Sequence, residues 1–74
     1  MDCAQEMMLA RSAYAAGDLI EARRHFGRAH GACHDDKRLH LSAHWGLARV
    51  ALRRGNLAAA LNHIALLTLA AIFD

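Results

Sequence analysis

The sequence predicts an all-α fold of four helices, arranged as two stacked antiparallel helical hairpins. The chain has no proline and few β-branched residues, and no strand-like alternation is present. Its apolar fraction of 55% is supplied largely by alanine, which forms helices well and lets them pack closely. A helix-turn-helix pattern also occurs twice, at residues 13–22 and 51–60. At 74 residues, we expect one domain, residues 1–74, with a small core.

The helix ends are indicated by capping residues. Gly17 and Gly55, 38 residues apart (55 − 17), are each expected to end a helix in the left-handed conformation. Asp18 and Asn56 then follow as N-caps, and the pair at residues 35–36 is expected to cap another helix. These signals predict helices over about residues 4–16, 19–34, 37–54 and 57–73.

Two of the predicted helices carry an apolar stripe that we expect to face the core. The stripe on the second helix is Leu19, Ala22, Phe26, Ala29 and Cys33, and the stripe on the third is Leu41, Trp45, Ala48 and Leu52, joined by Leu47 and Ala51. Ala22 and the equivalent Ala60 are expected to let the helices of each hairpin approach closely.

The fourth helix is apolar on nearly all sides. Its large apolar residues are Leu61, Ile64, Leu66, Leu67, Leu69, Ile72 and Phe73. Four short helices cannot cover that much apolar surface, so part of it is expected to contact another chain. A homodimer that buries Leu66, Leu69, Ile72 and Phe73 would cover it.

Residues 9–30 and 47–67 resemble the tetratricopeptide repeat, which implies helical hairpins that stack side by side and bind proteins. Three further segments are similar to a short bacterial domain family of unknown function, the one numbered 3703: Arg28-Ala29-His30, His40-Leu41-Ser42-Ala43-His44-Trp45 and Leu52-Arg53-Arg54-Gly55-Asn56. That resemblance spans about residues 9–67. It implies histidines at positions 30, 40 and 44 and supplies no activity.

Four of the six histidines are symmetrical about the centre of the chain, at His30, His34, His40 and His44. Each pair is spaced i, i+4 and therefore lies on one helical face. A hairpin folded at residues 36–37 would bring all four imidazoles together. Imidazole nitrogen suits zinc, copper or nickel.

Other groups near that turn could also act as ligands. Folding the first hairpin at Asp18 places Cys3 opposite Cys33, so a Cys33 thiolate could replace one imidazole. The carboxylates at residues 35–36 could bind or orient the rings. The predicted ligand set is His30, His34, His40, His44 and Cys33.

The alternative interpretation is that these histidines lie on a solvated edge, with His30 and His44 partly buried and hydrogen-bonded across the hairpin. His25 is expected on the surface. His63 is expected to lie too far along the fourth helix to join the cluster.

Composition and spacing argue against several function classes. The formal charge is only +2, and the pairs Arg24/Arg28 and Arg49/Arg53 are expected on solvated faces, so nucleic acid is not an expected partner. Residues 64–73 form an apolar stretch much shorter than the roughly 20 residues of a membrane span. No secretory signal is visible, which predicts a cytoplasmic protein. In a reducing compartment its two cysteines are expected to be free thiols or metal ligands rather than a structural disulfide.

We expect no enzymatic activity, because no oxyanion site is evident beside Cys33. The sequence instead predicts a protein-interaction module that self-associates through its fourth helix. The alternative function is a histidine-rich protein for transition-metal storage, sensing or delivery.

Overall fold

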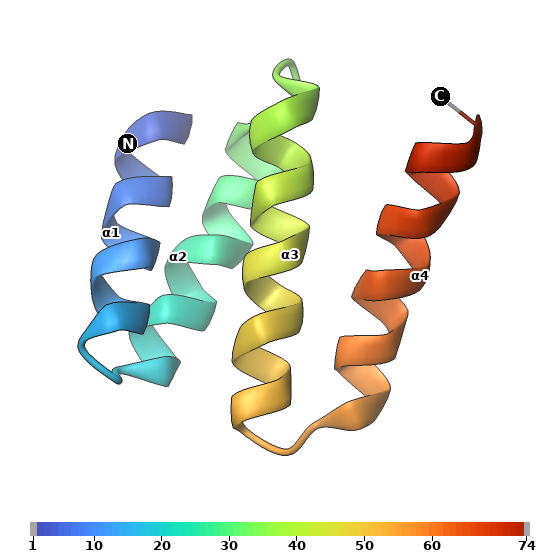
Figure 1. Ribbon diagram of the computed structural model, residues 1–74. Coiled ribbons are helices and arrows are strands. Elements are labelled where there is room, and N and C mark those ends of the chain that lie inside the picture. The colour runs from blue at the N-terminus through green and yellow to red at the C-terminus, as the bar shows by residue number, and fades with distance from the viewer. Residues whose placement is uncertain (1, 74) are drawn as a thin grey trace.

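A computed structural model gives the backbone of residues 2–73 and the side chains of residues 2–69. It confirms an all-α chain with four helices in the described residues: α1 (Cys3–Ala15), α2 (Leu19–Ala32), α3 (Lys37–Arg53) and α4 (Leu57–Phe73) (Figure 1). Their ends agree with the sequence prediction to within two residues.

The predicted turn residues determine these helix ends. Gly17 and Gly55 have φ angles of 80° and 77°, a left-handed conformation that side chains disfavour. Oδ1 of Asp18 accepts a hydrogen bond from the Glu21 amide at 3.2 Å. Asn56 and Asp36 cap α4 and α3 in the same way.

The four helices form a thin slab of 34 × 29 × 15 Å. α1 packs against α2, α2 against α3 and α3 against α4, with a smaller contact between α1 and α3. No Cα atom described for α4 lies within 8 Å of one in α1 or α2. Consequently α4 lies at one edge of the slab, next to α3 (Figure 1). The closer likeness to a tetratricopeptide repeat stays a prediction.

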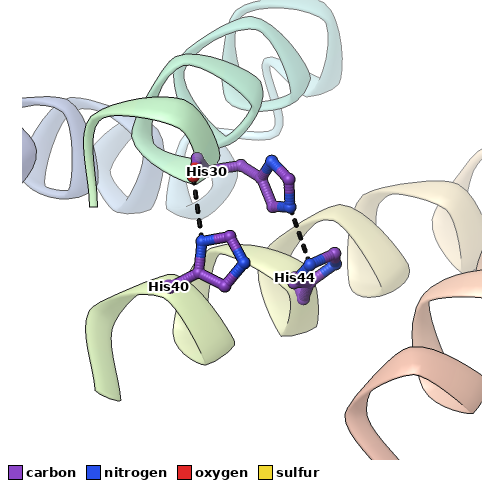
Figure 2. Close-up of side chains that lie close together, drawn as sticks. All are labelled: His30, His40 and His44. Carbon is purple, nitrogen blue, oxygen red and sulfur yellow. Dashed lines mark hydrogen bonds between the residues drawn. The ribbon is translucent and has the colours of Figure 1, made fainter. Parts of the chain in front are cut away.

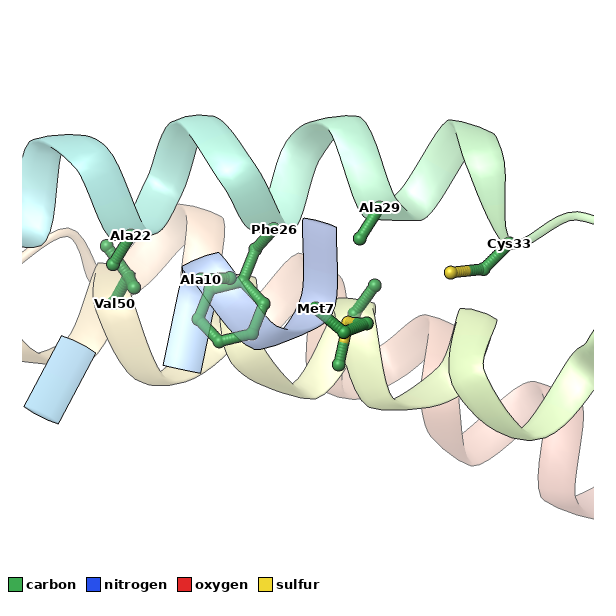
Figure 3. Close-up of a cluster of buried hydrophobic side chains, with 8 residues drawn as sticks. Met7, Ala10, Ala22, Phe26, Ala29, Cys33 and Val50 are labelled. Atoms are coloured by element: carbon green, nitrogen blue, oxygen red, sulfur yellow. The ribbon is translucent and has the colours of Figure 1, made fainter. Parts of the chain in front are cut away.

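The core lies between α1, α2 and α3 (Figure 3). The predicted stripe on α2 is confirmed, because Ala22, Phe26, Ala29 and Cys33 are all buried. Leu19, its first member, is partly buried against them. The buried Met7 of α1 and Val50 of α3 complete the same cluster. Most of these side chains are small, as a slab of this thickness requires.

The stripe predicted on α3 is partly wrong. Trp45 and Leu52 are 49% and 46% exposed, whereas Ala43, Gly46 and Val50 face inward. Gly46 packs against the Phe26 ring so closely that a Cβ at this position would overlap it. Small residues are needed where α3 meets α2, and this requirement turns Trp45 outward.

His25 is not on the surface, contrary to expectation. Its Nδ1 lies 2.6 Å from Oε2 of Glu6, a carboxylate that is only 4% exposed. Arg28 approaches the other oxygen of Glu6 at 4.0 Å. This pairing between α1 and α2 gives a buried carboxylate the partners that it needs.

The arginine pairs lie on partly solvated faces, as expected. Arg24 forms an ion pair with Glu21, and Arg49 and Arg53 lie over the Tyr14 ring at 4.4 and 4.9 Å from its centroid. Among the described residues, no helix combines the length and apolar character that a bilayer crossing requires.

Candidate metal centre

Three of the predicted ligands meet between α2 and α3. His30 lies in the last turn of α2, and His40 and His44 lie one turn apart on one face of α3. Asp36 caps the start of α3, which begins at Lys37, shortly before these two histidines. The ring centroid of His30 is 4.3 Å from that of His40 and 4.1 Å from that of His44.

The ring nitrogens of these three residues converge (Figure 2). Nε2 of His30 and Nε2 of His44 are 2.7 Å apart, which is the distance of a hydrogen bond. One potential ligand atom from each of His30, His40 and His44 lies within 4.8 Å of the other two. This hydrogen bond across the hairpin is the one that the alternative interpretation predicted, and it occurs inside the compact cluster that the metal interpretation requires.

The backbone determines which ring nitrogen of His40 carries hydrogen. Its Nδ1 is 2.9 Å from the carbonyl oxygen of His30, and a carbonyl can only accept, so Nδ1 carries the hydrogen and donates it. In a neutral ring, Nε2 is then left with a free lone pair. Figure 2 shows this second nitrogen on the side of the ring that faces His30 and His44.

A fourth histidine, His63 of α4, joins the cluster, contrary to expectation. Its Nδ1 lies 2.9 Å from Nδ1 of His44. The three rings of His30, His44 and His63 therefore form a hydrogen-bonded chain across three helices. If His44 donates from Nδ1 to His63, its Nε2 has a lone pair that faces His30.

His34 lies at the margin of the cluster. It is exposed, and its ring centroid is 5.2 Å from that of His40 and 6.5 Å from that of His30. Asp36 was expected to bind the metal or to orient the rings. Its carboxylate instead accepts a hydrogen bond from the Leu39 amide and caps α3. Asp35 is exposed.

The expectation of free thiols is wrong. Cys33 forms a disulfide with Cys3, and both sulfurs are therefore occupied. The antiparallel hairpin of α1 and α2 places the two Cα atoms 5.0 Å apart, within the range that a disulfide requires. Cys33 is therefore corrected from a candidate metal ligand to one half of a covalent link between α1 and α2.

The family model described as "Protein of unknown function (DUF3703)" matches residues 2–74. The chain belongs to this family. Neither the curated proteins nor the solved structures include a match to the chain. The resemblance inferred from the histidine segments is thus confirmed over a longer stretch than residues 9–67.

Burial and neighbouring imidazoles favour the neutral form of His30 and His44, and burial favours it for His63. Burial, followed by the nearby His30, His40 and His63, lowers the pKa of His44 from 6.5 to about 4. The pKa of His30 is lowered by burial and by His40, His63 and His34, and that of His63 by burial. A neutral imidazole is the form that ligates a metal.

The arrangement has the components of a three-histidine tripod. In a tetrahedral zinc site with Zn–N distances of about 2.0 Å, ligand nitrogens are about 3.3 Å apart. His30 and His44 would need to separate by about 0.6 Å and give up the hydrogen that they share. Other ligand nitrogens, which lie up to 4.8 Å apart, would need to approach by up to about 1.5 Å. The carbonyl of His30 already orients His40, as outer hydrogen bonds do in metal sites.

Proposed function

We propose that this protein binds a transition-metal ion, of the zinc, copper or nickel class, through His30, His40 and His44. The observation that carries this proposal is the convergence of three imidazoles within 4.8 Å, two of them held at their other nitrogen by a hydrogen bond. A tripod leaves a fourth coordination position for water, for the nearby His34 or for a group from a partner. Storage, sensing or delivery of the metal fits such a site, and no catalytic step is proposed.

The first test is the metal content of untagged protein, followed by titration with zinc, copper and nickel. One ion per chain, and a melting temperature that falls when a chelator is added, are expected because an ion that binds the folded state stabilises it. No bound metal, together with no change in melting on addition of metal or chelator, would overturn the proposal.

Two substitutions locate the site. His40→Gln should abolish stoichiometric binding, whereas His34→Gln should weaken it far less, because His34 lies outside the compact group. Circular dichroism establishes that each variant is folded. If the two variants bind metal equally well, His40 is not a ligand and the tripod is wrong.

A second candidate function, self-association through α4, is favoured by the surface of that helix. Leu57, Leu61, Leu66 and Leu69 are 63%, 64%, 43% and 50% exposed, and the described part of α4 packs on α3 alone. We propose that a second copy of the chain covers this surface. The side chains of Ile72 and Phe73, which the sequence analysis included, lie outside the described residues.

Sedimentation at micromolar concentration tests this second proposal. The wild type should sediment as a dimer and Leu66→Glu as a monomer. Met8→Glu is the matched control, since Met8 is another exposed apolar residue, at 60%, and lies on α1. A monomeric wild type, or equal effects of the two substitutions, would refute association through α4.

A further inference from the structure

A hollow of about 740 Å³ lies beside the histidine cluster, between α2, α3 and α4. It exists because α4 packs on α3 and leaves α2 on the opposite side of the gap. Its apolar lining comes from Ile20, Leu47, Val50, Ala51 and Ala59. Gly27 of α2 also lines it and has no atom within 4 Å of where its Cβ would be, so the missing side chain leaves open space. The volume is within the roughly 300–1,000 Å³ of small-molecule sites.

The charged residues that line the hollow all have the same sign. Arg23, Arg24 and Arg28 come from α2, Arg54 follows α3, and no acidic side chain is among the lining residues. The positions 20, 23, 24, 27 and 28 form one face of α2, because their spacing follows the helical repeat. This face combines an apolar base with guanidinium groups.

Two of the four arginines already have carboxylate partners. Arg24 is 3.2 Å from Glu21, and Arg28 is 4.0 Å from Glu6. Within residues 2–73, Arg23 and Arg54 form no ion pair, and both also line an adjoining hollow of about 550 Å³ with Gly55 and Asn56. Two unpaired positive charges therefore border one cavity, one from α2 and one from the end of α3.

The first turn of α4 adds to this positive potential. Asn56, its N-cap, lines both hollows, and the unpaired amides of a helix N-terminus favour anions. His63 lies along the same lining and is hydrogen-bonded to His44, so the cavity adjoins the histidine cluster.

We infer that this cavity binds a small phosphomonoester with an apolar body, whose phosphate lies between Arg23 and Arg54. A phosphomonoester carries a charge of about −1.5 to −2 at pH 7, which balances the two unpaired guanidinium groups. Guanidinium also forms paired hydrogen bonds with phosphate oxygens. The apolar body contacts Leu47, Val50 and Ala59.

The test uses metal-free protein in chelator, so that its outcome is independent of the proposed metal site. Phenyl phosphate is titrated by calorimetry, with inorganic phosphate and phenol as probes of the two halves of the ligand. Phenyl phosphate should bind at least about tenfold more tightly than either, and its affinity should fall as salt is raised. Equal affinities for phenyl phosphate and inorganic phosphate would overturn the inference.

Substitutions separate charge from shape. Arg23→Ala and Arg54→Ala should each weaken phenyl phosphate binding by about tenfold. Arg11→Ala, which removes the same charge from the exposed surface of α1, should leave it unchanged. Gly27→Leu keeps every arginine and fills part of the cavity. It should weaken the binding of phenyl phosphate more than that of inorganic phosphate. If Arg11→Ala has the same effect as Arg23→Ala, only net charge matters and no site exists.

A final comparison distinguishes a soluble ligand from a lipid headgroup. Vesicles that contain phosphatidic acid should bind the protein no better than vesicles of phosphatidylcholine alone. Strong binding to phosphatidic acid vesicles, without competition by phenyl phosphate, would overturn the inference and indicate a membrane-binding surface in place of a cavity for a soluble ligand.

Discussion

At the scale of single residues, the histidine spacing correctly predicted that His30, His40 and His44 come together, because each i, i+4 pair lies on one face of its helix. His34 lies at the exposed end of its pair, beside the turn. The contact of His63 was not predicted, because it depends on how far His63 and His44 each lie from the turn that joins α3 to α4. It lies 6 residues into α4, about 9 Å, and His44 lies 9 residues before the end of α3, about 13 Å. That difference is small enough for two imidazole side chains to span.

The neutral state of the buried rings has a consequence for stability. The pKa of His44 is about 4 in the folded protein, compared with 6.5 in the unfolded chain. As the pH falls, His44 therefore binds a proton in the unfolded chain before it does so in the folded protein. The metal-free protein should be fully stable above pH 6.5 and lose up to roughly 3 kcal/mol as the pH falls to about 4. Urea titrations across this range measure the loss.

The variant His44→Gln provides the control for that measurement, since it removes the histidine whose pKa is lowered most. Its free energy of unfolding should depend less steeply on pH between 6.5 and 4. An identical slope in the variant would show that other groups govern acid unfolding.

Gly46 tests the close approach of α2 and α3. Gly46→Ala should destabilise the protein by about 1–3 kcal/mol, because its Cβ would overlap the buried Phe26 ring. Gly27→Ala has open space at its Cβ and should stabilise α2 by up to about 1 kcal/mol through helix propensity alone. Opposite signs in thermal melts are expected, and a neutral Gly46→Ala would contradict the packing described here.

At the scale of helices, the ends were predictable because capping is local chemistry. Asp18, Asp36 and Asn56 each accept a hydrogen bond from an amide three residues later. The inward face of α3 was less predictable, since hydrophobicity favoured Trp45 whereas the close contact with Phe26 requires a glycine. Which face is buried depends on the partner helix as well as on the pattern.

The cap of α4 gives a prediction at this scale. Asn56→Ala removes the acceptor for the Ala59 amide and should cost about 1 kcal/mol. Asn62→Ala makes the same change at an exposed position within α4 and should cost nothing, because alanine is the better helix former. Chemical denaturation of both variants measures the difference.

At the scale of the whole molecule, the disulfide was the feature that the sequence analysis got wrong. The fold placed Cys3 opposite Cys33, as expected, but the argument from a reducing compartment predicted free thiols. Geometry was predictable from the hairpin, whereas oxidation state depends on surroundings that the residues do not specify.

Reduction of this disulfide should lower stability substantially. The bond joins residues 30 positions apart, and a loop of that length corresponds to about 3–4 kcal/mol of lost chain entropy in the unfolded state. Melting with and without reductant measures the effect. The Cys3→Ala/Cys33→Ala double variant should melt near the reduced wild type and be insensitive to reductant, and a reductant-sensitive variant would point to another cause.

The order in which the helices pack has a kinetic consequence. Apart from the contact between α1 and α3, each helix packs only on its immediate neighbours along the chain. Most contacts therefore join residues close in sequence, and the relative contact order is low. Helical proteins of this kind fold within microseconds to milliseconds, because little loop-closure entropy is lost before contacts form. The pairing of α2 with α3 that creates the three-histidine cluster can thus form early, before α4 brings His63 to it.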